Sequence, residues 1–235
     1  MRLPSVKTLA SRLAGKAPFE LEYYRESELR RLLNLFAHID LDDFKGMNIL
    51  EVGAGLGRLG AAFVELGFDV TSTDGRPEYV ERMKQEGRRA FVLDLDRTSV
   101  DEAGEFDIVL AFGVLYHLAE PERFLQGCAK ASRVLFLESV VRDAFDASLN
   151  PVRERTGWMG ADQAVSGTGC RPTPAWVEQT CHAAGFDDVR DISTSLANWS
   201  TGRYDWAVSG TNTTRQDAAN LRKMWVCVKT TEGPA

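Results

Sequence analysis

Short apolar runs alternate with helical patterns along most of the chain. Segments 48–52, 68–73, 90–93, 107–112 and 133–138 predict strands, and 107–112 is nearly all apolar, as in a strand buried on both faces. Helical spacing of Leu59, Phe63 and Leu66 predicts a helix over 57–66, and prolines 77 and 121 suit first helical positions. This alternation with short connections predicts a parallel sheet covered by helices on both faces.

The two ends of the chain follow other patterns. The first forty residues are predicted to be helical, with an apolar stripe of Leu29, Leu32, Leu33 and Phe36. Segments 142–171 and 193–222 have no clear period and are expected to be irregular. Between them, a helix is predicted to begin after the N-cap Thr173 and to end at Gly185. Segments 187–192 and 224–229 are the last two predicted strands. We therefore divide the chain into a helical lid segment, 1–40, and one domain, 41–235, with irregular substrate-recognition insertions at 142–171 and 193–222.

Charge and composition limit the partners. The net charge is -6, from 28 basic and 34 acidic residues, which disfavours nucleic acid as the main partner without excluding it. No apolar run is long enough to span a bilayer, and no secretory signal is evident near the start. The four cysteines form no C-x-x-C pair, so we expect a reduced, cytoplasmic protein. The oligomeric state stays open, with a dimer among the options.

A glycine-rich turn follows the first strand. Glycines 53, 55 and 57 alternate after Glu51, so the backbone can turn sharply and approach a ligand. Asp74 closes the second strand, where an acid can accept two hydrogen bonds from a ribose diol. Such an acid, facing a cleft, is expected to have few partners other than its ligand.

Two cofactors fit this turn. Residues 55–60 match G-x-G-x-x-G, the dinucleotide fingerprint, which leaves an NAD-dependent oxidoreductase as one interpretation. Three features favour instead a cofactor that carries an amino-acid moiety. The fingerprint begins two residues late relative to the strand end, Glu51 suits an amino group better than a pyrophosphate, and the chain is short for a dehydrogenase with a separate substrate domain.

Residues 48–138 resemble a class I S-adenosylmethionine (SAM)-dependent methyltransferase. Residues 51–57 are similar to motif I of that family, E/D-x-G-x-G-x-G, and residues 106–118, ending Leu-Tyr-His-Leu, resemble its fourth motif. The resemblance implies a seven-stranded Rossmann-like methyltransferase sheet, mostly parallel with the last strand antiparallel. It also implies SAM as cofactor, S-adenosylhomocysteine (SAH) as product, and cofactor contacts from Glu51, Gly53, Ala54, Gly55, Gly57, Asp74, Asp94, Leu95 and Phe112. Asp96 is a register alternative to Asp94 at the adenine.

His117 is the only histidine inside these motifs. It is a candidate general base for a hydroxyl proton, although packing beneath the cofactor explains it equally well. The candidate substrate residues are aromatic side chains and arginines of the lid, the fourth motif and the irregular segments, where loops commonly carry recognition. They are Tyr23, Tyr24, Tyr116, Arg171, Trp199, Arg203, Tyr204 and Trp206.

The sequence thus predicts methyl transfer from SAM to a small-molecule acceptor, at an oxygen or nitrogen of a sugar, a quinone-like ring or another secondary metabolite. No metal is expected, because Phe112 and Gly113 stand where metal-dependent relatives carry an acid. A tRNA-modifying methyltransferase that uses the basic N-terminus is the alternative within the class. An NAD-dependent oxidoreductase and a non-catalytic binding module are the alternatives outside it.

Overall fold

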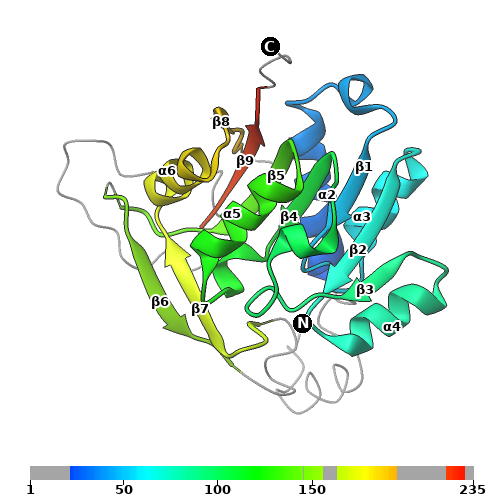
Figure 1. Cartoon of the computed structure of the whole chain (residues 1–235), viewed down its shortest axis with the longest axis horizontal. Helices are drawn as coiled ribbons and strands as arrows, with labels where there is room; N and C mark the ends of the chain where they lie inside the picture. The colour runs from blue at the N-terminus through cyan, green and yellow to red at the C-terminus, as the bar shows by residue number, and fades with distance from the viewer. Residues whose placement is uncertain (1–21, 145, 156–162, 195–220, 231–235) are drawn as a thin grey trace, which may run out of the picture.

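The computed structural model describes residues 22–144, 146–155, 163–194 and 221–230. Its main sheet contains β1 (Asn48–Glu51), β2 (Asp69–Asp74), β3 (Ala90–Val92), β4 (Ile108–Phe112), β5 (Val134–Val140), β8 (Asp188–Asp191) and β9 (Arg222–Val228). The strand order is β3-β2-β1-β4-β5-β9-β8 (Figure 1). Strands β1 to β5 pair in parallel, whereas β9 runs antiparallel to β5 and β8. The predicted seven-stranded sheet, mostly parallel with the last strand antiparallel, is confirmed.

Helices cover both faces of this sheet (Figure 1). On one face, α2 (Glu22–Phe36), η2 (Leu41–Phe44) and α3 (Arg58–Glu65) pack around the buried Phe63. On the other face, η3 (Val100–Ala103), α5 (Pro121–Ala131) and α6 (Pro174–Ala184) enclose a second apolar cluster that includes Phe124 and Trp225. The remaining elements are α4 (Pro77–Gln85) beside β2 and β3, and η4 (Leu115–His117) after β4. No helix of the described residues is both long and apolar enough to cross a lipid bilayer.

Part of the segment predicted to be irregular is in fact regular. Residues 142–171 contain β6 (Leu149–Arg153) and most of β7 (Thr168–Pro172), which pair antiparallel as a separate two-stranded sheet. The prediction is wrong for these strands. Their side chains are half-buried or exposed along β6, which also contains Pro151, so they lack the apolar run that marked the strands of the main sheet.

Helix α2 buries only part of the predicted stripe, because Leu32 and Phe36 pack against the apolar cluster but the other two leucines do not. Leu29 and Leu33 are largely exposed, at 56% and 48%, whereas Leu35 and Asn34 are fully buried. Asn34 Nδ2 donates to the carbonyl of Ile192 (2.9 Å), so a polar contact fixes the rotation of the helix. This rotation also turns Arg31 toward the interior, where it is 8% exposed.

The central strands should dominate the stability of the domain. Leu135 in β5 is fully buried, whereas Leu66, at the end of α3, is 50% exposed. We expect Leu135→Ala to lower the free energy of unfolding by about 2–5 kcal/mol, because it leaves a cavity. The control Leu66→Ala should change it by less than about 0.5 kcal/mol. Urea unfolding of both variants checks this, and equal losses would contradict the assignment of the core.

Candidate active site

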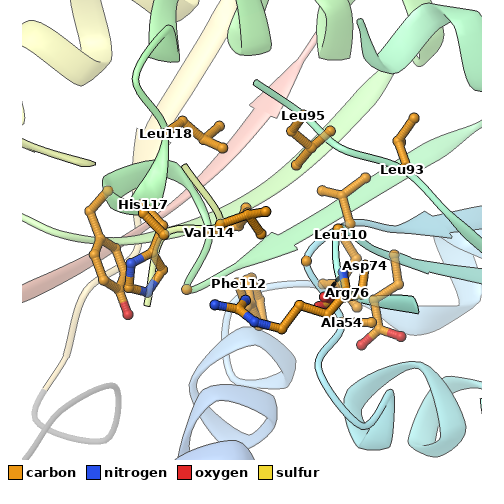
Figure 2. A pocket seen from close by; sticks show the side chains of 18 of the residues that line it. Ala54, Asp74, Arg76, Leu93, Leu95, Leu110, Phe112, Val114, His117 and Leu118 are labelled. Carbon is orange, nitrogen blue, oxygen red and sulfur yellow. Dashed lines mark hydrogen bonds between the residues drawn. The ribbon is translucent and has the colours of Figure 1, made fainter. Parts of the chain in front are cut away.

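A cleft of about 1040 Å³, its open mouth included, lies at the carboxyl ends of β1 to β4. In an open α/β sheet this edge is where ligands bind. Figure 2 shows His117 at one end of the cleft and Ala54 and Asp74 at the other, with Phe112 and Val114 between them. The structure brings together in its lining the predicted residues Tyr24, Glu51, Gly53, Ala54, Asp74, Asp94, Leu95, Phe112, Tyr116 and His117.

The glycine turn forms the floor of the cleft. Gly53, Gly55 and Gly57 have φ angles of 62°, 57° and 65°, in the left-handed region that side chains disfavour. A Cβ atom at Gly53 would also lie 2.6 Å from Val114 Cγ2, so no other residue fits there. Gly55 and Gly57 do not line the cleft themselves; they shape the turn that exposes Ala54 to it.

Glu51 ties the turn to its surroundings. Its carboxylate is 3% exposed and accepts hydrogen bonds from Ser72 Oγ (2.6 Å) and from the backbone N–H of Gly60 (3.0 Å). Gly60 is the third residue of α3, so the carboxylate caps a helix whose N-cap, Gly57, has no side chain to do so. Burial raises the pKa of Glu51 from 4.5 to about 7, against the opposing effect of these two hydrogen bonds.

Asp74 also holds the turn, which the sequence did not predict. One carboxylate oxygen accepts from Gly55 N and the other from Arg76 N, both at 2.8 Å. The expectation that this acid has few partners without a ligand is therefore wrong. Burial raises its pKa, and the two N–H groups oppose that effect. Each oxygen retains a second lone pair, so Asp74 can still accept from a diol that enters the cleft.

The loop after β3 supplies the next part of the wall. Asp94, Leu95 and Asp96 all line the cleft. The Asp96 carboxylate accepts from the N–H of Ala119 (2.9 Å), whereas the ion-pair partner of Asp94 is the solvent-exposed Arg97 (3.4 Å). The Asp94 carboxylate also accepts from the N–H of Asp96 (3.1 Å), so a backbone N–H group holds each of the two acids.

His117 stands at the opposite end of the cleft with a buried acid behind it. His117 Nδ1–H donates to Glu154 Oε2 (2.6 Å), and the Glu154 side chain is only 2% exposed. Ala164 N donates to the same oxygen (2.6 Å), and Arg171 lies 3.3 Å from the other one. Burial alone would raise the pKa of Glu154, but these three partners hold it below its ordinary value. A charged Glu154 fixes the imidazole with Nε2 available to a substrate.

The other predicted substrate residues have mixed outcomes. Arg171 does not line the cleft; it contacts Glu154 and the carbonyl of Tyr116 behind His117. The Tyr23 side chain is outside the described part of the structure. So are the remaining four, Trp199, Arg203, Tyr204 and Trp206.

Sequence reasoning missed several charged residues of this region. Glu154 sits in the segment expected to be irregular, and Arg31 in the lid helix. Glu138 and Arg222, from β5 and β9, form an ion pair at 2.9 Å. Glu138 carried a usable signal, because it is a charge inside the apolar strand 134–140, the same feature that singled out Glu51.

The strand order and the position of the cleft define the class. A glycine turn after β1, acids after β2 and β3 and an antiparallel β9 between β5 and β8 make up a Rossmann-like methyltransferase domain. The chain belongs to the methyltransferase domain family, whose model matches residues 21–191.

Individual relatives and solved structures agree with this family. The chain is 30% identical, over 125 residues, to a ubiquinone biosynthesis O-methyltransferase of Caulobacter vibrioides, a match that covers 48% of this chain and 46% of that protein. The chain thus spans about half the length of the curated relatives that it matches. Among solved structures, the N-terminal domain of EvdMO1, crystallised in the presence of SAH and D-fucose, has a TM-score of 0.66 at 21% identity over 96% of each chain. Magnesium protoporphyrin IX methyltransferase from Synechocystis, with bound SAM, has a TM-score of 0.55 at 13% identity, over 98% of this chain and all of that one.

The raised pKa of Glu51 should make stability depend on pH. The folded chain holds this proton more tightly than the unfolded chain does, so the free energy of unfolding should fall as pH rises from 4.5 to about 7. Relative to Glu51→Gln, we expect the wild-type chain to lose on the order of 3 kcal/mol across this range. Urea unfolding from pH 4.5 to 8 measures the difference.

The exposed acid Glu65, also on α3, offers a matched control. The stability difference between Glu65→Gln and the wild type should stay constant with pH. A constant difference for Glu51→Gln as well would contradict the assignment.

Proposed function

We propose that the chain binds SAM in this cleft and transfers its methyl group to a hydroxyl oxygen of a small-molecule acceptor. The observation that carries the proposal is the pairing of His117 with the buried Glu154 at one end of the cleft whose other end holds Glu51 and Asp74. In this proposal the general base, His117, lies across the cleft from the end that binds the nucleoside.

The residues present fit SAM. Gly53 lines the cleft and has no side chain, so a ligand can lie directly against its backbone. Glu51 would neutralise the ammonium group of the methionyl part, and Gly55 and Gly57 would keep the turn in shape. At the nucleoside end, Asp74 would accept from the ribose hydroxyls and Asp94 from the adenine amine, with Leu95 and Phe112 as apolar wall.

Bound SAM supplies a methyl group on a positively charged sulfur and leaves as SAH. His117 Nε2 accepts the proton that the acceptor hydroxyl loses on methylation. Glu154 holds the imidazole in the required tautomer and stabilises its cation, while Arg171 and Ala164 N hold Glu154. Much of the acceleration would come from positioning, since a reaction at a sulfonium needs mainly an in-line approach.

The relatives support an oxygen acceptor. The matched relative is named as an O-methyltransferase, and EvdMO1 was crystallised with a sugar. Tyr24 and Tyr116 both line the cleft, and Tyr116 directly precedes His117. They are the acceptor contacts that we propose among the described residues, with Tyr23, Trp199, Arg203, Tyr204 and Trp206 as further candidates from the sequence. All four cysteines are buried and free, which suits the proposed cytoplasmic location.

Transfer from methyl-labelled SAM to a panel of hydroxylated aromatic compounds and sugars tests the function. Label is expected in a methyl ether of at least one acceptor, with release of SAH. Binding of SAH without transfer to any member of the panel would support the rival interpretation, a binding module. Label in tRNA instead would support the other alternative.

The roles of His117 and Glu154 can be separated by kinetics. His117→Ala should lower kcat by about 10²–10⁴-fold, because the acceptor loses its general base. Glu154→Gln should lower kcat by about 10–100-fold, the equivalent of one hydrogen bond to a charged group. The residual kcat of His117→Ala should rise with pH, because the acceptor hydroxyl then loses its proton unaided.

SAH affinity of both variants should stay within about threefold of the wild type. Glu122→Gln, which removes an exposed acid of α5, is the matched control and should keep full kcat. An unchanged kcat in His117→Ala would show that the histidine only packs beside the cofactor.

A further inference from the structure

The peptide group between Gln163 and Ala164 links the two ends of the cleft. Its carbonyl accepts from Arg76 Nη2 (2.7 Å), and its N–H donates to Glu154 Oε2 (2.6 Å). Both hydrogen bonds are made by one planar unit, because the C=O and the N–H of a trans peptide point in opposite directions. A bridge of two hydrogen bonds therefore runs from Arg76 to the acid behind His117.

The backbone of Arg76 is fixed at the nucleoside end of the cleft. Arg76 is the N-cap of α4, and its own N–H donates to Asp74 (2.8 Å). Figure 2 shows these two residues at the same end of the cleft. The bridging segment packs closely there, because a Cβ atom at Gly75 would lie 3.0 Å from Val165 Cγ2. Residues 163–165 thus lie against the loop between β2 and α4, and all three line the cleft.

At the opposite end, the same peptide group fixes the carboxylate oxygen that His117 uses. Ala164 N and His117 Nδ1 both donate to Glu154 Oε2. Arg171 instead lies beside the other oxygen. The backbone restrains this part of the segment as well, since Glu154 N donates to the carbonyl of Gly167 and Gly167 N to that of Ala164. The Ala164 N–H is therefore the group that orients Oε2 toward the imidazole.

The positive charge of Arg76 acts through this peptide. A guanidinium at a carbonyl oxygen draws electron density toward that oxygen, which makes the N–H of the same peptide a stronger donor. Such polarisation is largest where water is excluded, and here Ala164 is 3% exposed and the Glu154 side chain 2%. Arg76 therefore strengthens the hydrogen bond to Glu154 without touching that residue.

We propose that Arg76 is a positioning residue for the general base, which it holds in place through the 163–164 peptide and Glu154. The inference rests on the proposed function and deepens it, because it joins the end that binds the nucleoside to the group that removes the proton. In this role Arg76 acts on His117 and not on the reacting atoms. Its loss should therefore lower the rate of transfer more than the affinity for either ligand.

Proton NMR of the full chain tests the bridge without an acceptor. The amide proton of Ala164 and the Nδ1 proton of His117 should both resonate far downfield, because both donors bind a buried carboxylate. Glu154→Gln should move both signals upfield and so calibrates the measurement. Arg76→Met should move both in the same direction by a smaller amount. Arg76→Lys, which keeps the charge and a donor, should leave them nearer their wild-type positions.

Kinetics with an acceptor from the panel above gives a second readout. Arg76→Met should lower kcat by about 3–10-fold, the size of one neutral hydrogen bond. The KM of the acceptor and the SAH affinity should stay within about threefold of the wild type. Arg76→Lys should recover most of kcat. The matched control is Arg82→Met, at an exposed position of α4, which should change neither kcat nor the two proton signals.

Several results would overturn the inference. In Arg76→Met these are proton signals that do not move, an unchanged kcat, or a loss of SAH affinity beyond about threefold, which would assign the side chain to the cofactor. A kcat that Arg76→Lys does not restore would overturn it as well. Failure of the wild-type chain to bind SAH would instead overturn the proposed function, and the proton signals would then still show whether Arg76 holds Glu154 and His117.

Discussion

The buried carboxylate of Glu51 joins the elements from which the cleft is built. It leaves β1, accepts from Ser72 on β2, and caps α3 through Gly60 N. A Cβ atom at Gly60 would collide with this carboxylate, so the close approach requires glycine. The left-handed turn between β1 and α3 is therefore held at both ends by one acid, and Asp74 secures its middle through Gly55 N. Burial of such a charge is costly without a ligand, which is typical of a site prepared for a cation.

The two ends of the cleft carry different chemical groups. Acids dominate where β1, β2 and β3 end, whereas a histidine and two arginines face the cleft beyond β4. The small sheet of β6 and β7 connects them. It provides Glu154 behind His117, and Gln163 in the loop between its strands accepts from Arg76, next to Asp74. The described residues of this loop thus reach both His117 and the end of the cleft that holds Asp74.

The features that the sequence predicted correctly are those fixed by burial or by backbone conformation. Strands β4 and β5 are apolar runs because both of their faces are covered, and the motif glycines are tied to a left-handed turn that other residues disfavour. The small sheet escaped prediction because the side chains of β6 are half-buried or exposed and β7, Thr-Gly-Cys-Arg-Pro, is not an apolar run. Glu154 lies between two arginines and has no apolar neighbour to mark it. Arg31 and Arg222 escaped because their role depends on tertiary contacts with Glu138, which no local pattern encodes. The burial of Glu138 within an apolar strand could have been noticed by the reasoning applied to Glu51.

The most direct test of this account is calorimetric titration of the chain with SAH and, separately, with NAD⁺ at the same concentrations. A turn organised by Glu51 and an acid at Asp74 suit a ligand with an ammonium group and a single ribose diol. The account predicts one SAH per chain and no heat of binding from NAD⁺. Binding of NAD⁺ without binding of SAH would contradict it.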